Sequence, residues 1–325
     1  MKLDLPKPGL LPKLRLLLLG ALALALSPVA SAATPGKTVN AAATLAYNIK
    51  SLPFNRAIQK AYIASSYVYV TQRVDGTVHL SRCLISGNNA TYQDHMTLTN
   101  CGHGQTLDMY TYNGINYLYV SSKADPATSN YWSLQVARII YSAGATYDYT
   151  SLRRFTYMNY ANKTGTSLGT TYRVDAGGKS THTVFRVQTE EGTVTWSVYD
   201  TVALNRLLDA NTQVQMNSTG AVNACLYSFT QNGTDIIRPN GSFQGADLLG
   251  STEIYTSGGA EGQVPSIALI GHTGAYRSLV RITNVGNHEI EGVQTKSGNA
   301  YFVIVPDPDN KQSTQKIYHV SDLIF

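Results

Sequence analysis

Alternating apolar and polar positions recur along the chain from about residue 58 and predict short β-strands. The segment Tyr67–Val70 alternates, Asp75 and Gly76 mark a tight turn, and the alternation resumes at Thr77–Leu80. A strand, an Asp-Gly turn and a second strand are typical of a β-hairpin. The hairpin is therefore the local unit that this pattern predicts.

One two-strand unit recurs five times. Its clearest copy, Phe243–Gly258, has a polar opening, a short apolar run, a Gly-Ser turn and a strand that ends in Tyr-Thr-Ser. The other copies are Gln59–Thr71, Gln105–Ser122, Tyr172–Gln188 and Glu291–Val305. The intervals between consecutive copies are 46, 67, 72 and 47 residues. Repeats of about 45–50 residues with four strands each have the size of β-propeller blades.

The repeat predicts an all-β fold, a five-bladed β-propeller over residues 51–325. Radial repetition protects the sheet edges that an open sheet would expose. The two longer intervals would carry inserts, and Thr201–Asp209 is the best candidate for one short helix because its leucines and valine form an imperfect apolar face. Ala221–Thr230 then resumes the strand pattern. A two-sheet sandwich, or a pair of them, is the competing fold, but it does not explain the recurrence.

The first 32 residues have the pattern of a secretory signal peptide. A basic start is followed by the uncharged apolar run Leu16–Leu26 and by Ala30-Ser31-Ala32, which fits a cleavage site. The apolar run is too short to span a bilayer as a stable helix, although an uncleaved anchor is the alternative. We expect cleavage after about Ala32, a flexible lead-in over residues 33–50, and a secreted, extracellular protein without stable membrane insertion.

Composition supports an exported β-protein and excludes a nucleic-acid partner. The formal charge is +5, but residues 1–32 contain four basic residues and one acidic residue, so about +2 remains for the mature chain. The mature chain has no run of Lys or Arg of the kind that binds nucleic acids. Charged residues are sparse at 14%, and the 22 tyrosines favour half-buried pleated surfaces.

The three cysteines allow one disulfide and one free thiol. Cys83 and Cys101 enclose a short loop between two predicted blades and are the expected pair, although pairings with Cys225 stay open. Cys225 lies in an alternating strand pattern, which favours a buried, inert thiol over a catalytic one.

Each copy of the repeat opens with two residues, mostly polar, that are three positions apart. If the first strand of each blade borders the central axis, these side chains would converge on one ligand. The candidate ligand-binding residues are Gln105, Asp108, Asp175, Gln244, Asp247, Glu291 and Gln294. Alternatively, such residues only satisfy turns or tie one blade to the next, because positions i and i+3 of a strand point to opposite faces.

The sequence contains no established catalytic motif. It lacks H-E-x-x-H, G-x-S-x-G and a Walker-type loop, and its His, Cys and Asp residues do not have finger-like zinc spacing. We therefore expect no metal, no cofactor and no catalytic residues. Most tyrosines should pack between sheets, and a few exposed ones would offer stacking platforms for sugars.

Several segments in series resemble the helveticin J family of large secreted class III bacteriocins. They are Tyr131–Tyr141, Arg154–Gly165, Trp196–Asp209, Phe243–Gly258 and the C-terminal series from His288 to Val320. Their order and spacing agree with the family over about residues 60–320. The resemblance implies a β-propeller and the killing of related Gram-positive bacteria.

Three functions follow from the sequence. The first is an antibacterial protein that recognises a cell-envelope component of competing bacteria, a glycan or a teichoic acid. The second is a secreted glycan-binding or adhesion propeller without toxicity. The third, a propeller hydrolase acting on an envelope polymer, is disfavoured because no coherent acid–base or nucleophile set is present.

Overall fold

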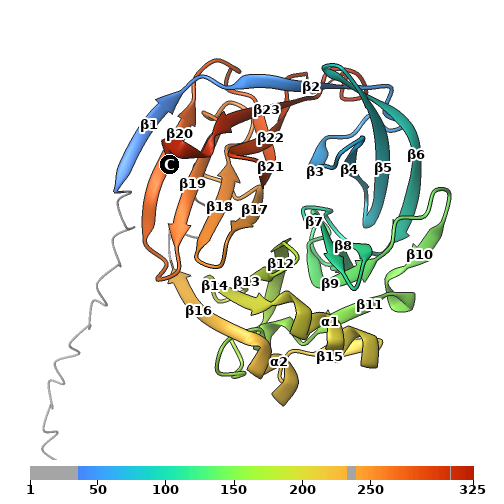
Figure 1. Cartoon of the computed structure of the whole chain (residues 1–325), viewed down its shortest axis with the longest axis vertical. Coiled ribbons are helices and arrows are strands. Elements are labelled where there is room, and N and C mark those ends of the chain that lie inside the picture. The colour runs from blue at the N-terminus through green and yellow to red at the C-terminus, as the bar shows by residue number, and fades with distance from the viewer. Residues whose placement is uncertain (1–35, 233–238, 308) are drawn as a thin grey trace, which may run out of the picture. The chain divides into compact units, whose positions relative to one another are not determined.

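The computed structural model describes residues 36–232, 239–307 and 309–325. Within them, five β-sheet blades are arranged around a central axis (Figure 1). The expected signal peptide, residues 1–32, lies outside the described residues. None of the described helices is both long and apolar enough to cross a membrane.

Each blade contains four consecutively paired antiparallel strands, which follow one another from the axis outward. Blade 1 comprises β3 (Ile58–Ile63), β4 (Tyr67–Val74), β5 (Thr77–Ser86) and β6 (Asn89–Thr99). Blade 2 comprises β7 (Leu107–Tyr112), β8 (Ile115–Ala124), β9 (Ser133–Ile139) and β11 (Arg153–Thr156). Blade 3 comprises β12 (Thr171–Gly178), β13 (His182–Thr189), β14 (Thr193–Asp200) and β16 (Cys225–Asn232).

The last two blades complete the ring. Blade 4 comprises β17 (Gly245–Leu249), β18 (Glu253–Gly258), β19 (Ser266–Gly271) and β20 (Tyr276–Ile282). Blade 5 comprises β21 (Glu289–Lys296), β22 (Asn299–Val305), β23 (Lys316–Ser321) and the N-terminal strand β2 (Thr44–Lys50). The inner strands β3, β7, β12, β17 and β21 contact one another in this order, and β21 contacts β3. The sequence prediction of a five-bladed propeller is therefore confirmed.

The N-terminal strands close the ring, which corrects the prediction of a flexible lead-in over residues 33–50. The strand β1 (Lys37–Ala41) pairs in parallel with β20, and β2 pairs with β23 and, in parallel, with β6. The side chains of β1 are mostly small and polar, which favoured a linker. In β2, by contrast, Leu45, Tyr47 and Ile49 alternate as in a strand, and this signal was missed. Two further short strands, β10 (Thr146–Asp148) and β15 (Gln213–Gln215), extend blades 1 and 2.

The two longer repeat intervals carry the inserts. The predicted helix is present as α1 (Thr201–Ala210), whose first turn is capped where Asp200 Oδ1 accepts a hydrogen bond from Ala203 N at 2.8 Å. A second helix, α2 (Thr219–Ala224), replaces the start of the strand expected at 221–230, and β16 begins only at Cys225. The 3₁₀ turns are η1 (Tyr149–Ser151), η2 (Met158–Tyr160) and η4 (Asp322–Ile324).

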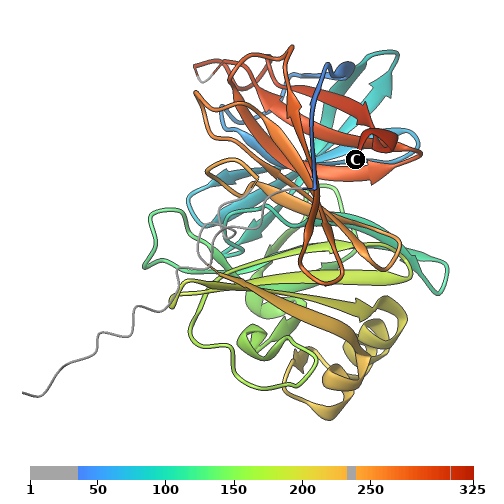
Figure 2. The same ribbon diagram turned by 90° about the vertical axis from the view of Figure 1, so that its left-hand side faces the viewer.

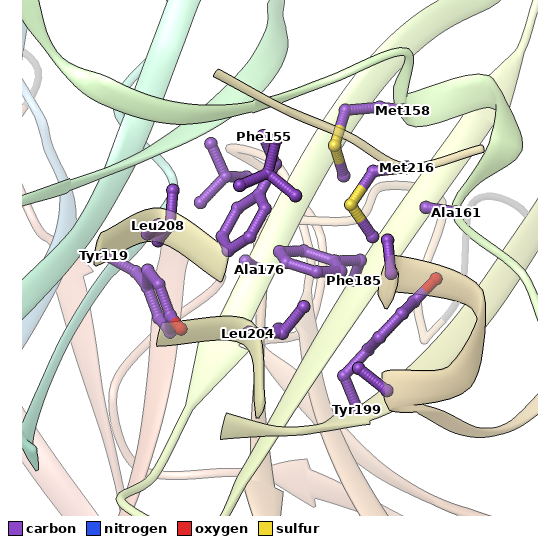
Figure 3. Packing of buried hydrophobic residues seen from close by; sticks show 14 of the residues in the cluster. Tyr119, Phe155, Met158, Ala161, Ala176, Phe185, Tyr199, Leu204, Leu208 and Met216 are labelled. Atoms are coloured by element: carbon purple, nitrogen blue, oxygen red, sulfur yellow. The ribbon is translucent and has the colours of Figure 1, made fainter. Parts of the chain in front are cut away.

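Five hydrophobic clusters of described residues lie between neighbouring blades. The one between blades 2 and 3 contains Tyr119, Phe155 and Phe185, and α1 adds Leu204 and Leu208 to it (Figure 3). Burying a side chain of this size contributes about 2–3 kcal/mol. Figure 2 shows the blades from the side. Each blade is thus held by the apolar contacts on both of its faces.

The expected disulfide between Cys83 and Cys101 is absent, and all three cysteines are free and buried. Cys83 belongs to the cluster between blades 5 and 1, whereas Cys101 belongs to the cluster between blades 1 and 2. The two thiols thus lie in different interfaces, on opposite sides of blade 1. Burial raises the pKa of Cys83 to about 12 and that of Cys225 to about 11.

Candidate functional site

Two pockets occupy the two ends of the axis. The first, which we name the Glu291 pocket, has a volume of about 350 Å³ and lies where the inner strands begin. Its lining residues are Arg56, Ala57, Gln59, Arg73, His103, Asn130, Trp132, Gln244, Glu289, Glu291 and Lys311. The second, which we name the Lys296 pocket, has a volume of about 370 Å³ and lies where these strands end.

Two ion pairs fill the axis between the pockets, and three of their four side chains are fully buried. Lys60 Nζ lies 2.7 Å from Asp108 Oδ2, and neither side chain is exposed. The same ammonium donates a hydrogen bond to Ala246 O at 2.8 Å. Beside it, Lys179 Nζ lies 2.5 Å from Asp247 Oδ2, which also accepts a hydrogen bond from Thr295 N at 2.6 Å. These contacts join β3 to β7 and β17, and they join β17 to β21 and to the end of β12, which Lys179 follows.

Glycines allow this close packing at the axis. A Cβ atom on Gly292 would lie 2.7 Å from Cγ of Lys60, and one on Gly245 would lie 2.7 Å from Cα of Gly292. Real Cβ atoms do not approach other atoms so closely, so a larger residue at either position would push the inner strands apart. The glycines of β17 and β21 therefore serve the packing of the axis.

The charge of Asp108 depends on two opposing effects. Burial raises its pKa and the ammonium of Lys60 lowers it; the effect of burial is larger, so the pKa is raised to about 7. Asp108 Oδ1 has no hydrogen-bond partner among the described residues. A carboxylate in this position holds blades together and is closed to solvent.

The Glu291 pocket contains two buried oxygen atoms to which no described residue donates a hydrogen bond. Glu291 is 2% exposed and Gln59 is 8% exposed, and neither Glu291 Oε2 nor Gln59 Oε1 has a hydrogen-bond partner among the described residues. Burial, together with the nearby carboxylate of Glu289, raises the pKa of Glu291 well above its usual value. Most buried polar atoms in proteins are hydrogen-bonded, so two exceptions in one pocket favour a binding site.

A stack of side chains forms the wall of this pocket. The ring of Trp132 lies 4.3 Å from that of His103, and the guanidinium carbon of Arg173 lies 4.1 Å from the indole centroid. His103 Nδ1 lies 2.7 Å from Asn130 O, and burial lowers the pKa of His103 to about 3, so this nitrogen donates from a neutral ring at neutral pH. His103 and Arg173 therefore pack against the ring of Trp132, which is not free to stack against a sugar.

A chain of hydrogen bonds crosses the floor and joins four blades. Arg173 donates to Gln105 Oε1, Gln105 Nε2 donates to Gln244 Oε1 at 2.8 Å, and Gln244 Nε2 donates to Glu289 Oε1 at 3.1 Å. Arg173 also pairs with Asp175, with 2.8 Å between Nε and Oδ2. This network fixes the orientation of the polar groups in the pocket.

Three cationic side chains that line the same pocket have no carboxylate partner in the described part of the chain. Among the described residues, Arg56, Arg73 and Lys311 form no salt bridge. Arg73 Nη1 donates only to a backbone carbonyl, Asn130 O, at 2.7 Å. These side chains therefore retain hydrogen-bond donors and positive charge that a ligand could use.

The seven predicted ligand-binding residues are all near the axis but do not meet at one point. Gln244 and Glu291 line the Glu291 pocket, and Gln105 lies behind them. Asp108 and Asp247 are in the filled middle, and Asp175 is held by Arg173 and Arg186. Gln294 lines the Lys296 pocket, where its side chain accepts a hydrogen bond from Ile63 N at 2.7 Å. The seven side chains therefore do not line one common pocket in the part of the chain that the structure describes, and their binding of a ligand stays a prediction.

Strand geometry explains the separation. Residues three apart on a strand differ by about 10 Å along its axis, which carries the second member of each pair away from the first. Both members still face inward, because β7 and β17 begin after Gln105 and Gln244, and because β21 has an irregularity between Glu291 and Val293. The second members mainly tie blades together, which was the alternative interpretation.

Several residues of the pocket were not among the predicted site residues. They are Arg56, Gln59, Arg73, His103, Trp132, Glu289 and Lys311. Glu289 could have been predicted from the sequence, because it is two positions from Glu291 and so lies on the same face of the strand. The cationic residues carry no such signal, since they come from a loop, a second strand and a segment near the C-terminus.

A larger cavity of about 400 Å³ lies away from the axis, beside Thr156, Tyr157 and Gln213. None of its lining residues has a buried polar atom without a partner in the described part of the chain. The Glu291 pocket is the stronger candidate because it contains buried oxygen atoms that no described residue satisfies with a hydrogen bond.

Comparison with known proteins gives a family for the chain. The family model described as "Bacteriocin helveticin-J" matches residues 37–288, which is more than half of the chain. This confirms the resemblance derived from the sequence. A search of the curated proteins found no match.

Solved structures with similar backbones are distant in sequence. An exo-β-1,3-galactanase from Phanerochaete chrysosporium has a TM-score of 0.47 at 9% identity, with 86% of this chain and 63% of that chain covered. The chain thus spans less than two thirds of the galactanase chain. RS223-β-xylosidase has a TM-score of 0.38 at 10% identity, with 84% and 94% covered. The WD40 domain of coronin from Toxoplasma gondii has a TM-score of 0.33 at 7% identity, with 86% and 85% covered.

Proposed function

Because the chain belongs to the helveticin J family of bacteriocins, we propose that it is a secreted antibacterial protein that recognises a cell-envelope component of competing bacteria. The observation that carries this proposal is the family match over residues 37–288, which includes all or part of every blade. Export is supported by the signal-peptide pattern of residues 1–32.

The Glu291 pocket is the proposed recognition site. It is open to solvent at one end of the axis, and the hydrogen-bonded network of Gln105, Gln244 and Glu289 gives it a fixed geometry. Binding sites are usually pre-formed concave surfaces with a few convergent polar groups. The proposed partner is a glycan or a teichoic acid of the bacterial envelope.

A spot-on-lawn assay with the purified mature protein, residues 33–325, tests the antibacterial function. We expect zones of inhibition on some strains of a Gram-positive panel, and none from protein that has been irreversibly heat-denatured. Absence of inhibition on every strain, from protein shown to be folded, would refute the antibacterial function.

The alternative function is a glycan-binding or adhesion protein without toxicity. It is favoured by the same pocket, whose unpartnered oxygens and cations suit binding and require no killing step. Pull-down with purified cell walls separates the two: binding to walls of strains that the protein never inhibits supports adhesion, whereas binding confined to inhibited strains supports the bacteriocin.

A further inference from the structure

We propose that the Glu291 pocket binds an anionic, hydroxyl-bearing group, meaning a sugar or polyol unit that carries a phosphate or a carboxylate. This inference rests on the proposed function in so far as it names the chemistry of the recognised envelope component. It is argued from the polar atoms that the pocket leaves without partners.

The buried oxygens select a hydroxyl group. Gln59 Oε1 only accepts hydrogen bonds, and Glu291 Oε2 accepts when ionised and can donate when protonated. Both residues line the pocket, and neither atom has a partner among the described residues. A ligand hydroxyl can donate to Gln59 and exchange a hydrogen bond with Glu291, which removes the cost of leaving these atoms unsatisfied.

The cationic side chains select an anion. Arg56, Arg73 and Lys311 line the pocket and form no salt bridge with any residue that the structure describes. Glu289 and Glu291 provide the carboxyl groups of the pocket, and burial raises the pKa of Glu291 well above its usual value. Positive charge is therefore in excess, and guanidinium groups suit phosphate and carboxylate oxygens especially well.

The aromatic wall argues against a neutral sugar held by stacking. Trp132 is packed against His103 and Arg173, and its indole nitrogen donates to Tyr172 Oη at 2.9 Å. The ring is thus engaged by its neighbours, and recognition falls to the charged and hydrogen-bonding groups. A neutral hexose would leave the three cations without partners.

The opposite end of the axis is a weaker candidate for this role. Lys296 Nζ donates to Ile63 O and Ala64 O, both at 3.0 Å, and Lys179 is paired with Asp247. Their hydrogen bonds tie blade 5 to blade 1 and β12 to β17. The cations of the Lys296 pocket are therefore largely occupied, unlike those of the Glu291 pocket.

Small probes measured by calorimetry test the inference. Glycerol 1-phosphate and glucuronic acid carry both required groups, inorganic phosphate carries only the charge, and glycerol and glucose carry only hydroxyls. We expect the first two to bind at least about tenfold more tightly than the other three, and their binding to weaken as the salt concentration rises.

Two pocket variants and one control separate the contributions. Arg73→Gln should weaken binding of every anionic probe by about tenfold, because it removes one charge-assisted contact. Gln59→Leu should weaken the binding of glycerol 1-phosphate and leave the binding of inorganic phosphate unchanged, because only the hydroxyl contact is lost. Arg281→Gln removes an exposed cation on β20, outside the pocket, and should change neither. Thermal unfolding of each variant confirms that it is folded.

The outcomes distinguish this inference from the proposed function. Tight binding of only one of the two probes that carry both a charge and a non-acidic hydroxyl group, glycerol 1-phosphate or glucuronic acid, supports the inference and identifies the source as a polyol phosphate or a uronic acid. Equal binding of glucose and glycerol 1-phosphate, or no loss in Arg73→Gln, overturns it. Inhibition zones from a protein that binds none of the probes overturn the inference alone, whereas probe binding without inhibition on any strain overturns only the antibacterial function.

Discussion

At the scale of single residues, the position of a polar side chain along the propeller axis determines whether it holds blades together or is available to a ligand. Asp108 and Glu291 both lie on inner strands and are both buried. Lys60 lies 2.7 Å from Asp108, whereas no cation of the described residues lies within salt-bridge distance of Glu291. A buried pair holds strands together, whereas a buried carboxyl group with an unpartnered oxygen in a pocket is available to a ligand. This difference yields two predictions.

The first concerns the Lys60–Asp108 pair. Lys60→Met should lower the free energy of unfolding by about 3–5 kcal/mol, because it leaves Asp108 buried without its cation. The double variant with Asp108→Leu should be more stable than the sum of the two single variants indicates. Chemical denaturation measures all three. The matched control is Arg277→Met, whose exposed pair with Glu253 should contribute at most about 1 kcal/mol. Additive single-variant effects at Lys60 and Asp108 would contradict the prediction.

The second concerns pH. The folded-state pKa of Glu291 is raised, so above about pH 4.5 the folded protein holds a proton that the unfolded chain releases. The contribution of Glu291 to stability is therefore greatest at acidic pH and decreases as the pH rises toward its folded pKa. Glu291→Gln removes this decrease, so its free energy of unfolding, measured by chemical denaturation at each pH, should exceed that of the wild type by a margin that grows from pH 4.5 to 7, reaching about 1–3 kcal/mol. A margin independent of pH would count against the assignment, and Glu190→Gln in an exposed turn is the control.

At the scale of elements, the propeller depends on strands that its own repeat does not contain. Blade 5 obtains its outer strand, β2, from the N-terminal segment, and β2 also pairs with β6 of blade 1. Strand β1 adds only an edge to blade 4, through parallel pairing with β20. The two N-terminal strands should therefore differ in importance.

Substitutions that shorten one apolar side chain in each strand test this difference. Ile49 on β2 is fully buried between blades 5 and 1, whereas Val39 on β1 is half-buried. Ile49→Ala should lower the free energy of unfolding by about 2–5 kcal/mol, and Val39→Ala by about 1 kcal/mol or less. Chemical denaturation compares them. Equal effects would mean that β2 does not close the ring as described.

At the scale of the whole molecule, the sequence predicts the fold better than the site. The two-strand unit that recurs in the sequence, for example in Gln105–Ser122 and Phe243–Gly258, corresponds to the inner hairpin of each blade. Five copies therefore predict five blades. The pocket, by contrast, combines side chains as far apart in the chain as Arg56 and Lys311. Such long-range proximity is set by ring closure, and ring closure depends on the pairing of β2 with β23 and β6, which the sequence of β2 alone does not reveal.

The cysteines give a last test at this scale, because each lies in a different interface between blades. Cys83 lies between blades 5 and 1, Cys101 between blades 1 and 2, and Cys225 between blades 2 and 3. Buried thiols with raised pKa values react slowly, so a thiol reagent should label none of them in the native protein at pH 8 and all three in denaturant, without prior reduction.

The melting temperature of the protein should be the same with and without dithiothreitol, because the described cysteines form no disulfide for dithiothreitol to reduce. Labelling of only one thiol in unreduced, denatured protein would instead reveal a disulfide, and the blade interfaces would then have to differ from those described. If labelling reaches three thiols in one cooperative step with unfolding, the three interfaces open together and the ring unfolds as a unit.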